Sequence, residues 1–114
     1  MRIKAGIWVS AYLRRLNAMA VPALVVRRGD ADAGAIYIKI NTLDGQALLL
    51  RPAVAGKEGA EDERFWSLAF AAARPEPEVD RYLARQREFD ADLWVIEVED
   101  RSGRHFIEDC VLTD

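Results

Sequence analysis

The chain has 114 residues, of which 51% are hydrophobic and 31% are charged, and its formal net charge is −3. This composition excludes a disordered chain and predicts one globular domain over residues 1–114, long enough to bury its own core. No stretch approaches the roughly 18 apolar residues of a membrane helix, and one cysteine excludes an intramolecular disulfide, which favours a cytoplasmic protein.

Residues 6–20, GIWVSAYLRRLNAMA, are the first predicted element, an amphipathic helix. Val9, Leu13 and Leu16 recur at the spacing of one helix face, and Pro22 ends the pattern. The same run imitates a secretory signal, but two arginines interrupt its apolar part. A helix of the folded domain is therefore the preferred interpretation.

Three predicted strands follow, at residues 22–28, 34–41 and 46–52. The second and third are joined by LDG at 43–45, which allows two registers. A three-residue loop with Gly45 in the left-handed conformation sets Ile38 opposite Leu50, whereas a two-residue turn sets Ile38 opposite Arg51. The first register places apolar residues together on one face, so the three-residue loop is predicted.

The next two segments have weaker patterns. Residues 53–62 are small and charged, which is typical of a surface loop. Residues 64–71 fit two structures, since Trp66 and Leu68 alternate as in a strand whereas the alanine-rich end suits a helix. A strand is the preferred interpretation.

Residues 76–90, EPEVDRYLARQREFD, give the clearest helix pattern, and Pro77 suits its first turn. Its predicted apolar stripe consists of Val79, Tyr82, Leu83, Gln86 and Phe89. Residues 93–100, LWVIEVED, are predicted to form a strand. The three-residue loop RSG then pairs it, as a hairpin, with residues 104–110, RHFIEDC.

This hairpin holds the only histidine and the only cysteine of the chain. His105 and Cys110 are five residues apart, so a continuous strand directs them to opposite faces, and a Cys/His catalytic pair is disfavoured. Cys110 is interpreted as a small apolar residue. The predicted register sets His105 opposite Glu99, whose charge is expected to raise the histidine pKa.

A polar patch on the same hairpin is an alternative site. The residues that share this face, here called the hairpin patch, are Glu97, Glu99, His105 and Asp109. Carboxylates and an imidazole hold divalent metals or perform acid–base chemistry, but strand alternation also produces ordinary solvated faces of this composition. No phosphate loop or dinucleotide fingerprint is present, and no cofactor is predicted.

Together these elements predict a single α+β domain in the order αββββαββ. Its sheet is expected to have five or six strands, to be mostly antiparallel, and to carry two amphipathic helices on one face. The other face is then open. It carries Tyr37, Lys39 and Asn41 with the hairpin patch, which makes it the predicted surface for a partner.

Charge is distributed unevenly along the chain. Residues 1–56 carry eight basic and three acidic side chains, a net charge of +5, whereas residues 57–114 carry eight and sixteen, a net charge of −8. Such complementary charge favours a non-enzymatic binding or regulatory module acting through protein contacts, with an unidentified partner or as a homodimer.

Two other functions fit the residues. The first is a small enzyme or metal-dependent binding protein that uses the hairpin patch. The second is a nucleic-acid-associated factor, whose phosphate contacts would come from Arg14, Arg15, Arg27 and Arg28. The acidic overall charge makes nucleic acid the less favoured partner.

Three segments carry a resemblance to a known family: WVSAYLRR near the start, GAIYIKI with DG soon after it, and EFDADLWVIEVEDRSGRHFI near the end. In them the chain resembles domain-of-unknown-function family 1491, a family of small alphaproteobacterial proteins. The resemblance spans nearly the whole chain, and the last segment is its most specific part. It implies a bacterial cytoplasmic protein of one domain, and it supplies no catalytic residues.

Overall fold

A computed structural model describes residues 2–53 and 63–112 of the chain. The elements in chain order are α1 (Ala5–Ala18), β1 (Ala23–Arg27), β2 (Ile36–Asn41), β3 (Gln46–Pro52), β4 (Trp66–Leu68), β5 (Arg74–Pro75), α2 (Glu76–Phe89), β6 (Trp94–Glu99) and a 3-10 turn at Glu108–Cys110. The predicted surface loop at 53–62 lies, apart from its first residue, outside the described residues. No helix in the described ranges is long and apolar enough to cross a membrane.

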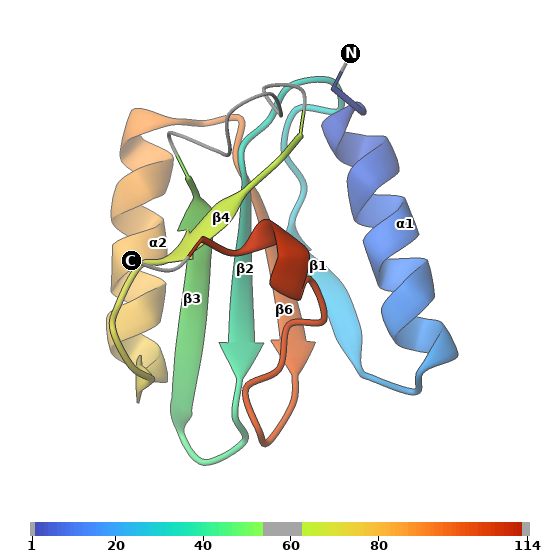
Figure 1. Cartoon of the computed structure of the whole chain (residues 1–114). Coiled ribbons are helices and arrows are strands. Elements are labelled where there is room, and N and C mark those ends of the chain that lie inside the picture. Colours follow the sequence, from blue (N-terminus) through green and yellow to red (C-terminus); the bar gives the residue numbers. More distant parts are fainter. Residues whose placement is uncertain (1, 54–62, 113–114) are drawn as a thin grey trace.

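The strands form one six-stranded sheet, which confirms the predicted α+β class (Figure 1). Its main order is β1-β6-β2-β3-β4, and β5 pairs with the beginning of β3. The pairings between these strands are antiparallel except that of β2 with β6, which is parallel. The last strand of the chain therefore lies in the interior of the sheet, between β1 and β2.

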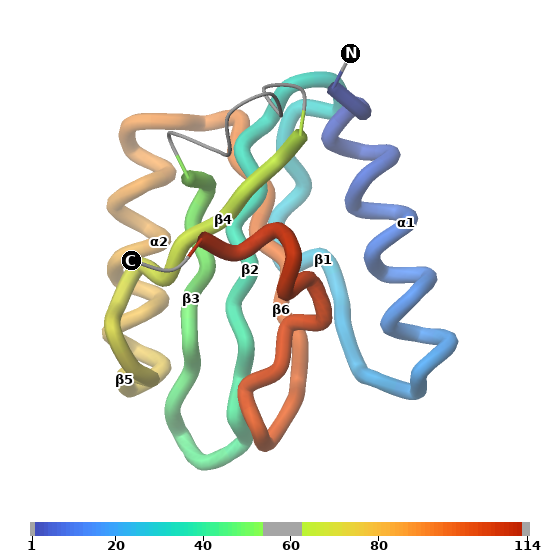
Figure 2. The backbone as a smooth tube through the Cα atoms, viewed as in Figure 1, coloured from blue at the N-terminus to red at the C-terminus, as the bar shows by residue number. Residues whose placement is uncertain are grey.

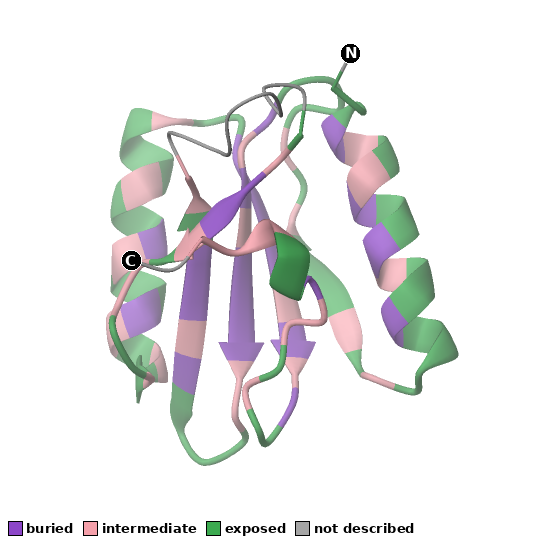
Figure 3. Cartoon of the chain, in the orientation of Figure 1, coloured by how far each residue is buried: buried purple, intermediate pink, exposed green. Residues whose placement is uncertain are grey.

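The two helices cover opposite faces of this sheet, so the prediction of two helices on one face is wrong. Side chains alternate along β2, and Ile36, Ile38 and Ile40 pack with α1 while Tyr37 packs with α2. Strand β3 is apolar on both faces, with Leu50 toward α1 and Leu49 toward α2. Since both faces carry apolar residues, each needs its own cover, and Figure 3 shows buried positions running along the central strands.

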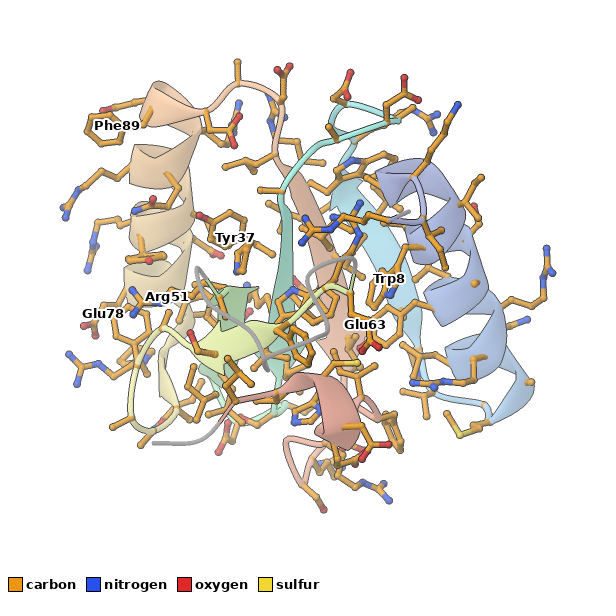
Figure 4. The ribbon with its side chains drawn as sticks, turned by 45° about the horizontal axis from the view of Figure 1, so that its top comes forward. Trp8, Tyr37, Arg51, Glu63, Glu78 and Phe89 are labelled. Carbon is orange, nitrogen blue, oxygen red and sulfur yellow. The ribbon has the colours of Figure 1, made fainter. Side chains whose placement is uncertain are left out.

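Both helices form as predicted, but their buried stripes differ from the expected ones. In α1 the buried residues are Ala5, Val9, Tyr12 and Leu16, while Leu13 is only partly buried. In α2 the buried residues are Val79 and Leu83, and Phe89 is 82% exposed. Figure 4 shows Phe89 pointing away from the molecule, whereas Tyr37 lies between α2 and the sheet. A stripe predicted from apolar spacing alone therefore includes residues such as Phe89, which lie at the end of a helix where it no longer contacts the sheet.

The register of the β2–β3 hairpin is the predicted one, with Ile38 opposite Leu50 and Ile40 opposite Leu48. The amide of Thr42 donates to the carbonyl of Gln46 at 3.1 Å, which closes the three-residue loop LDG. Gly45 has a φ of 84°, in the left-handed region.

We expect Gly45→Val to lower the free energy of unfolding by roughly 1 kcal/mol or more. A Cβ atom at this position would meet nothing within 4 Å, so the cost comes from the backbone conformation alone. Urea denaturation compares the variant with the native chain. Gly45→Asn is the control, because asparagine tolerates a positive φ, and it should cost less. Equal losses for the two variants would contradict this cause.

The predicted second strand of the C-terminal hairpin does not form. Strand β6 already pairs with β1 on one edge and β2 on the other, so no edge remains for residues 104–110. After β6 the chain turns at Gly103, whose φ is 73°, and the Asp100 carboxylate accepts hydrogen bonds from the Arg104 amide and guanidinium at 2.8–3.1 Å. These bonds hold the pKa of Asp100 below its usual range.

The segment after this turn crosses back over the α1 side of the sheet toward β4 (Figure 2). Its main chain is fixed by the Tyr12 hydroxyl, which donates to the His105 carbonyl at 2.9 Å, and by the Leu112 amide, which donates to the Trp66 carbonyl at 2.7 Å. Ile107 is buried in the same core as α1. The observed order thus ends in a 3-10 turn instead of the last predicted strand, while the predicted strand at 64–71 is confirmed over its middle, Trp66–Leu68.

Candidate functional site

His105 lies in the C-terminal segment on the α1 side of the sheet. The sheet face predicted to bind a partner is the opposite one. Its ring nitrogen Nδ1 accepts the amide of Ile107 at 3.1 Å. Burial lowers the pKa of His105, and the charge of Glu108 opposes this shift without reversing it. The predicted Glu99–His105 pair and the raised histidine pKa are therefore both wrong, because the hairpin that joined them does not exist.

The hairpin patch is not assembled. Glu97 lies on β6 and faces α2, where it contacts Lys39, whereas Asp109 is exposed in the 3-10 turn. Within residues 2–53 and 63–112, no group of three or more histidine, cysteine or acidic side chains is placed to hold a metal ion. Cys110 closes the 3-10 turn and packs against the α1 core, in agreement with its interpretation as a small apolar residue.

The lowered pKa of His105 predicts a pH dependence of folding. The unfolded chain takes up the proton first, so stability is full above the ordinary histidine pKa of 6.5 and is lost as pH falls through that value toward the folded one. An NMR titration of this single histidine should give a pKa below 6.5. His105→Asn keeps an acceptor near Nδ1 but does not titrate, so its stability should fall less on acidification. A pKa above the ordinary value would contradict the burial of the ring.

The polar residues of the α2 face meet in a compact cluster around Lys39, which is only 4% exposed. Its ammonium nitrogen lies 3.0 Å from a carboxylate oxygen of Glu76, 3.0 Å from one of Asp80 and 3.4 Å from one of Glu97. The Asn41 amide donates to Glu76 at 3.1 Å and to Glu97 at 3.4 Å, which links two of the three acids. This Lys39 cluster joins the first turns of α2 to β2 and β6.

The chemistry of the Lys39 cluster is that of an anchor. Burial opposes the charged ammonium, but the hydrogen bonds that it donates to Glu76 and Asp80 and the charge of Glu97 outweigh burial and raise the pKa of Lys39. A nucleophilic lysine needs a lowered pKa. The ammonium group of Lys39, by contrast, is surrounded by three carboxylates, as many as it has protons to donate. Tyr37 packs in the same layer under α2. The predicted partner face is therefore covered, and it is not an open surface.

The open apolar surface lies elsewhere, along β1 at the end of the sheet. Four large apolar side chains there are exposed, and we name them the β1-edge surface: Ile7, Leu24, Val25 and Val26. Three of these are consecutive in an edge strand, and Leu24 and Val26 are 57% and 55% exposed. An unpaired, apolar edge strand is a template for pairing with another chain, which proteins otherwise suppress. The sequence signal was PALVVRR, but no local pattern says which strand ends a sheet.

A groove of about 310 Å³ runs between α1 and β1 beside this surface. Its lining includes Ile7 and Leu13 of α1, Val25 of β1 and the Trp94 ring. Lys4 and Arg28 also line it, and the Arg28 guanidinium lies 5.3 Å from the centre of the Trp94 ring. The groove is thus lined by apolar side chains and by charged ones.

The four arginines considered for nucleic acid are only partly available. Arg15 donates to the Phe106 carbonyl. Arg27 donates to the carbonyls of Leu93 and Ala91, both at 2.8 Å. Two of the four guanidinium groups therefore hold the protein's own main chain. The other two are exposed but lie in different parts of the chain, Arg14 on α1 and Arg28 directly after β1.

Comparison with known proteins gives one consistent result. A family model described as "Protein of unknown function (DUF1491)" matches residues 3–108. A crystal structure of a DUF1491 family protein from Caulobacter crescentus is 37% identical, with a TM-score of 0.80 over 99% of this chain and 100% of that one. An NMR structure of a DUF1491 family protein from the same organism is 38% identical, with a TM-score of 0.79 over 99% of both chains. A solution structure from A. tumefaciens is 36% identical, with a TM-score of 0.74 over 87% and 86%. No curated protein matches.

Proposed function

Because the chain belongs to the DUF1491 family, whose description names no activity, we propose a function from its own surfaces: it is a non-enzymatic, cytoplasmic module that binds a protein partner through the β1-edge surface. The observation that carries this proposal is the exposure of three consecutive apolar side chains, Leu24, Val25 and Val26, in the terminal strand of the sheet. Large apolar side chains left exposed along one edge of a sheet are typical of an interaction site.

Two further observations support the proposal. The side chains with the most reactive chemistry are held in internal contacts, His105 by an amide and Lys39 by three carboxylates. The single cysteine leaves folding independent of an oxidising compartment, which supports a cytoplasmic location.

Photo-cross-linking in the host cell tests the proposed surface. A photoreactive amino acid at Val26 should give an adduct with one protein, whereas the same group at Arg85, an exposed position of α2, should not. The captured protein is then purified, and its binding to this chain is measured directly. Leu24→Lys should weaken that binding about tenfold or more, because it places a charge in a desolvated contact. Identical adducts from both positions, or no binding between the pure proteins, would contradict the proposal.

A further inference from the structure

The outer edge of β1 has main-chain groups directed away from the sheet. Antiparallel ladders alternate pairs that exchange hydrogen bonds with pairs that do not. The Glu99 amide donates to the Pro22 carbonyl at 2.9 Å, and Leu24 is opposite Glu97 in the same register. Pro22 and Leu24 therefore direct their main chain toward β6. Ala23 and Val25, which alternate with them, direct theirs outward, where β1 ends the sheet.

The side chain of Val25 connects this edge to the groove. Val25 is opposite Ile96, which belongs to the core under α1, so its side chain lies on the α1 side of the sheet. It lines the groove together with Ile7 and Leu13. Residues directly opposite each other on neighbouring strands project to the same face. A strand added beside β1 would therefore place the residue opposite Val25 in the groove between the edge and α1.

The charged side chains of the groove indicate which kind of added strand would fit beside β1. Its charged side chains are Lys4, Arg28 and Asp32, and Lys4 lies 3.7 Å from Asp32. Among the residues described, none forms an ion pair with Arg28, which stacks on Trp94. Within residues 2–53 and 63–112, one positive charge at the groove is thus left without an anion. Residues 22–28 of a second copy, PALVVRR, contain no carboxylate and cannot supply one.

We infer that β1 takes an added strand from a partner protein. The segment bound is extended, places an apolar side chain opposite Val25 in the groove, and carries a carboxylate within reach of Arg28. Main-chain pairing supplies affinity in such strand addition, and the pockets for alternate side chains supply specificity. This inference rests on the proposed function and specifies how its surface binds.

Selection from a library of random-sequence peptides, displayed as fusions and long enough to span β1, provides the probe. Enriched peptides should share apolar residues at alternate positions and an aspartate or glutamate. In NMR spectra of the labelled protein, a synthetic copy of an enriched peptide should shift the amide of Val25, with cross-strand contacts that define one register.

Substitutions then separate the parts of the site. Val25→Pro removes an outward N–H that the sheet does not use, a change that edge strands accept, and should weaken the peptide about tenfold or more. Ile7→Glu, which puts a charge into the groove wall, should weaken peptide binding by a similar factor. Arg28→Gln, which removes the cation, should do the same. Both are exposed, so they test the site even if Val25→Pro fails to fold. Phe89→Glu is the matched control on the far helix and should change nothing.

The outcomes distinguish strand addition from the broader proposal. No enriched peptide, or peptides that bind equally well to Val25→Pro and Ile7→Glu, overturns strand addition. Light scattering that shows a dimer, dissociated by Val25→Pro, identifies a second copy as the occupant and overturns it as well. A partner cross-linked through Val26 whose binding survives both substitutions leaves the proposed function standing while strand addition fails.

Discussion

Trp66→Ala is expected to lower the free energy of unfolding by about 3–5 kcal/mol, the range for removing a buried tryptophan. The side chain is fully buried, its ring centroid lies 4.7 Å from that of Trp8, and its indole nitrogen donates to the Ile36 carbonyl at 2.8 Å. The residue also bridges to Val111, so it joins α1, β2 and the C-terminal segment in one core. Urea denaturation followed by circular dichroism measures the loss.

Trp66→Phe separates the packing from the hydrogen bond. Phenylalanine keeps an aromatic ring in the core but removes the indole donor, so the expected loss is smaller, about 1–3 kcal/mol. A loss in Trp66→Phe as large as in Trp66→Ala would mean that the bond to Ile36, and not burial of the ring, is the dominant effect.

Lys39→Met is expected to lower the free energy of unfolding by roughly 2–4 kcal/mol. The substitution keeps the length of the side chain but leaves the carboxylates of Glu76, Asp80 and Glu97 close together without a cation. Breaking a fully buried ion pair on one side costs about 3–5 kcal/mol, and the partial exposure of these acids reduces that figure. Urea denaturation at neutral pH gives the value.

Two further variants test the cause. Adding Glu97→Gln to Lys39→Met removes the least exposed of the three acids and should recover part of the loss. Arg74→Gln breaks the exposed pair with Glu78 and should cost no more than about 0.5 kcal/mol. If Lys39→Met matched Arg74→Gln, the cluster would not anchor α2 to the sheet.

Local patterns predicted those elements that local forces determine. The spacing of Val9 and Leu16 gave α1, and the match of Ile38 with Leu50 gave the register of the first hairpin, because each depends on residues close in the chain. The family was also predicted, since its segments can be read directly from the sequence.

The rest depends on which strands become neighbours, and no local pattern contains that information. Residues 93–100 and 104–110 have good hairpin chemistry around Gly103, but pairing of β6 with both β1 and β2 excludes the second strand. The same pairing separates Glu99 from His105, which removed the predicted site. The strand pattern predicted that Lys39 is solvated. In the structure it contacts Glu76 and Asp80 of α2, which are about 40 residues further along the chain.

The interior position of β6 also sets the order of events during synthesis. Strands β1 and β2 leave the ribosome early, yet in the finished sheet they are not neighbours. The strand that pairs with both of them, β6 at residues 94–99, is synthesised much later. Such pairing between distant segments is typical of slower folding. Until translation has passed Glu99, the nascent chain exposes the unpaired inner edge of each strand and its apolar side chains, which are the features that a chaperone binds.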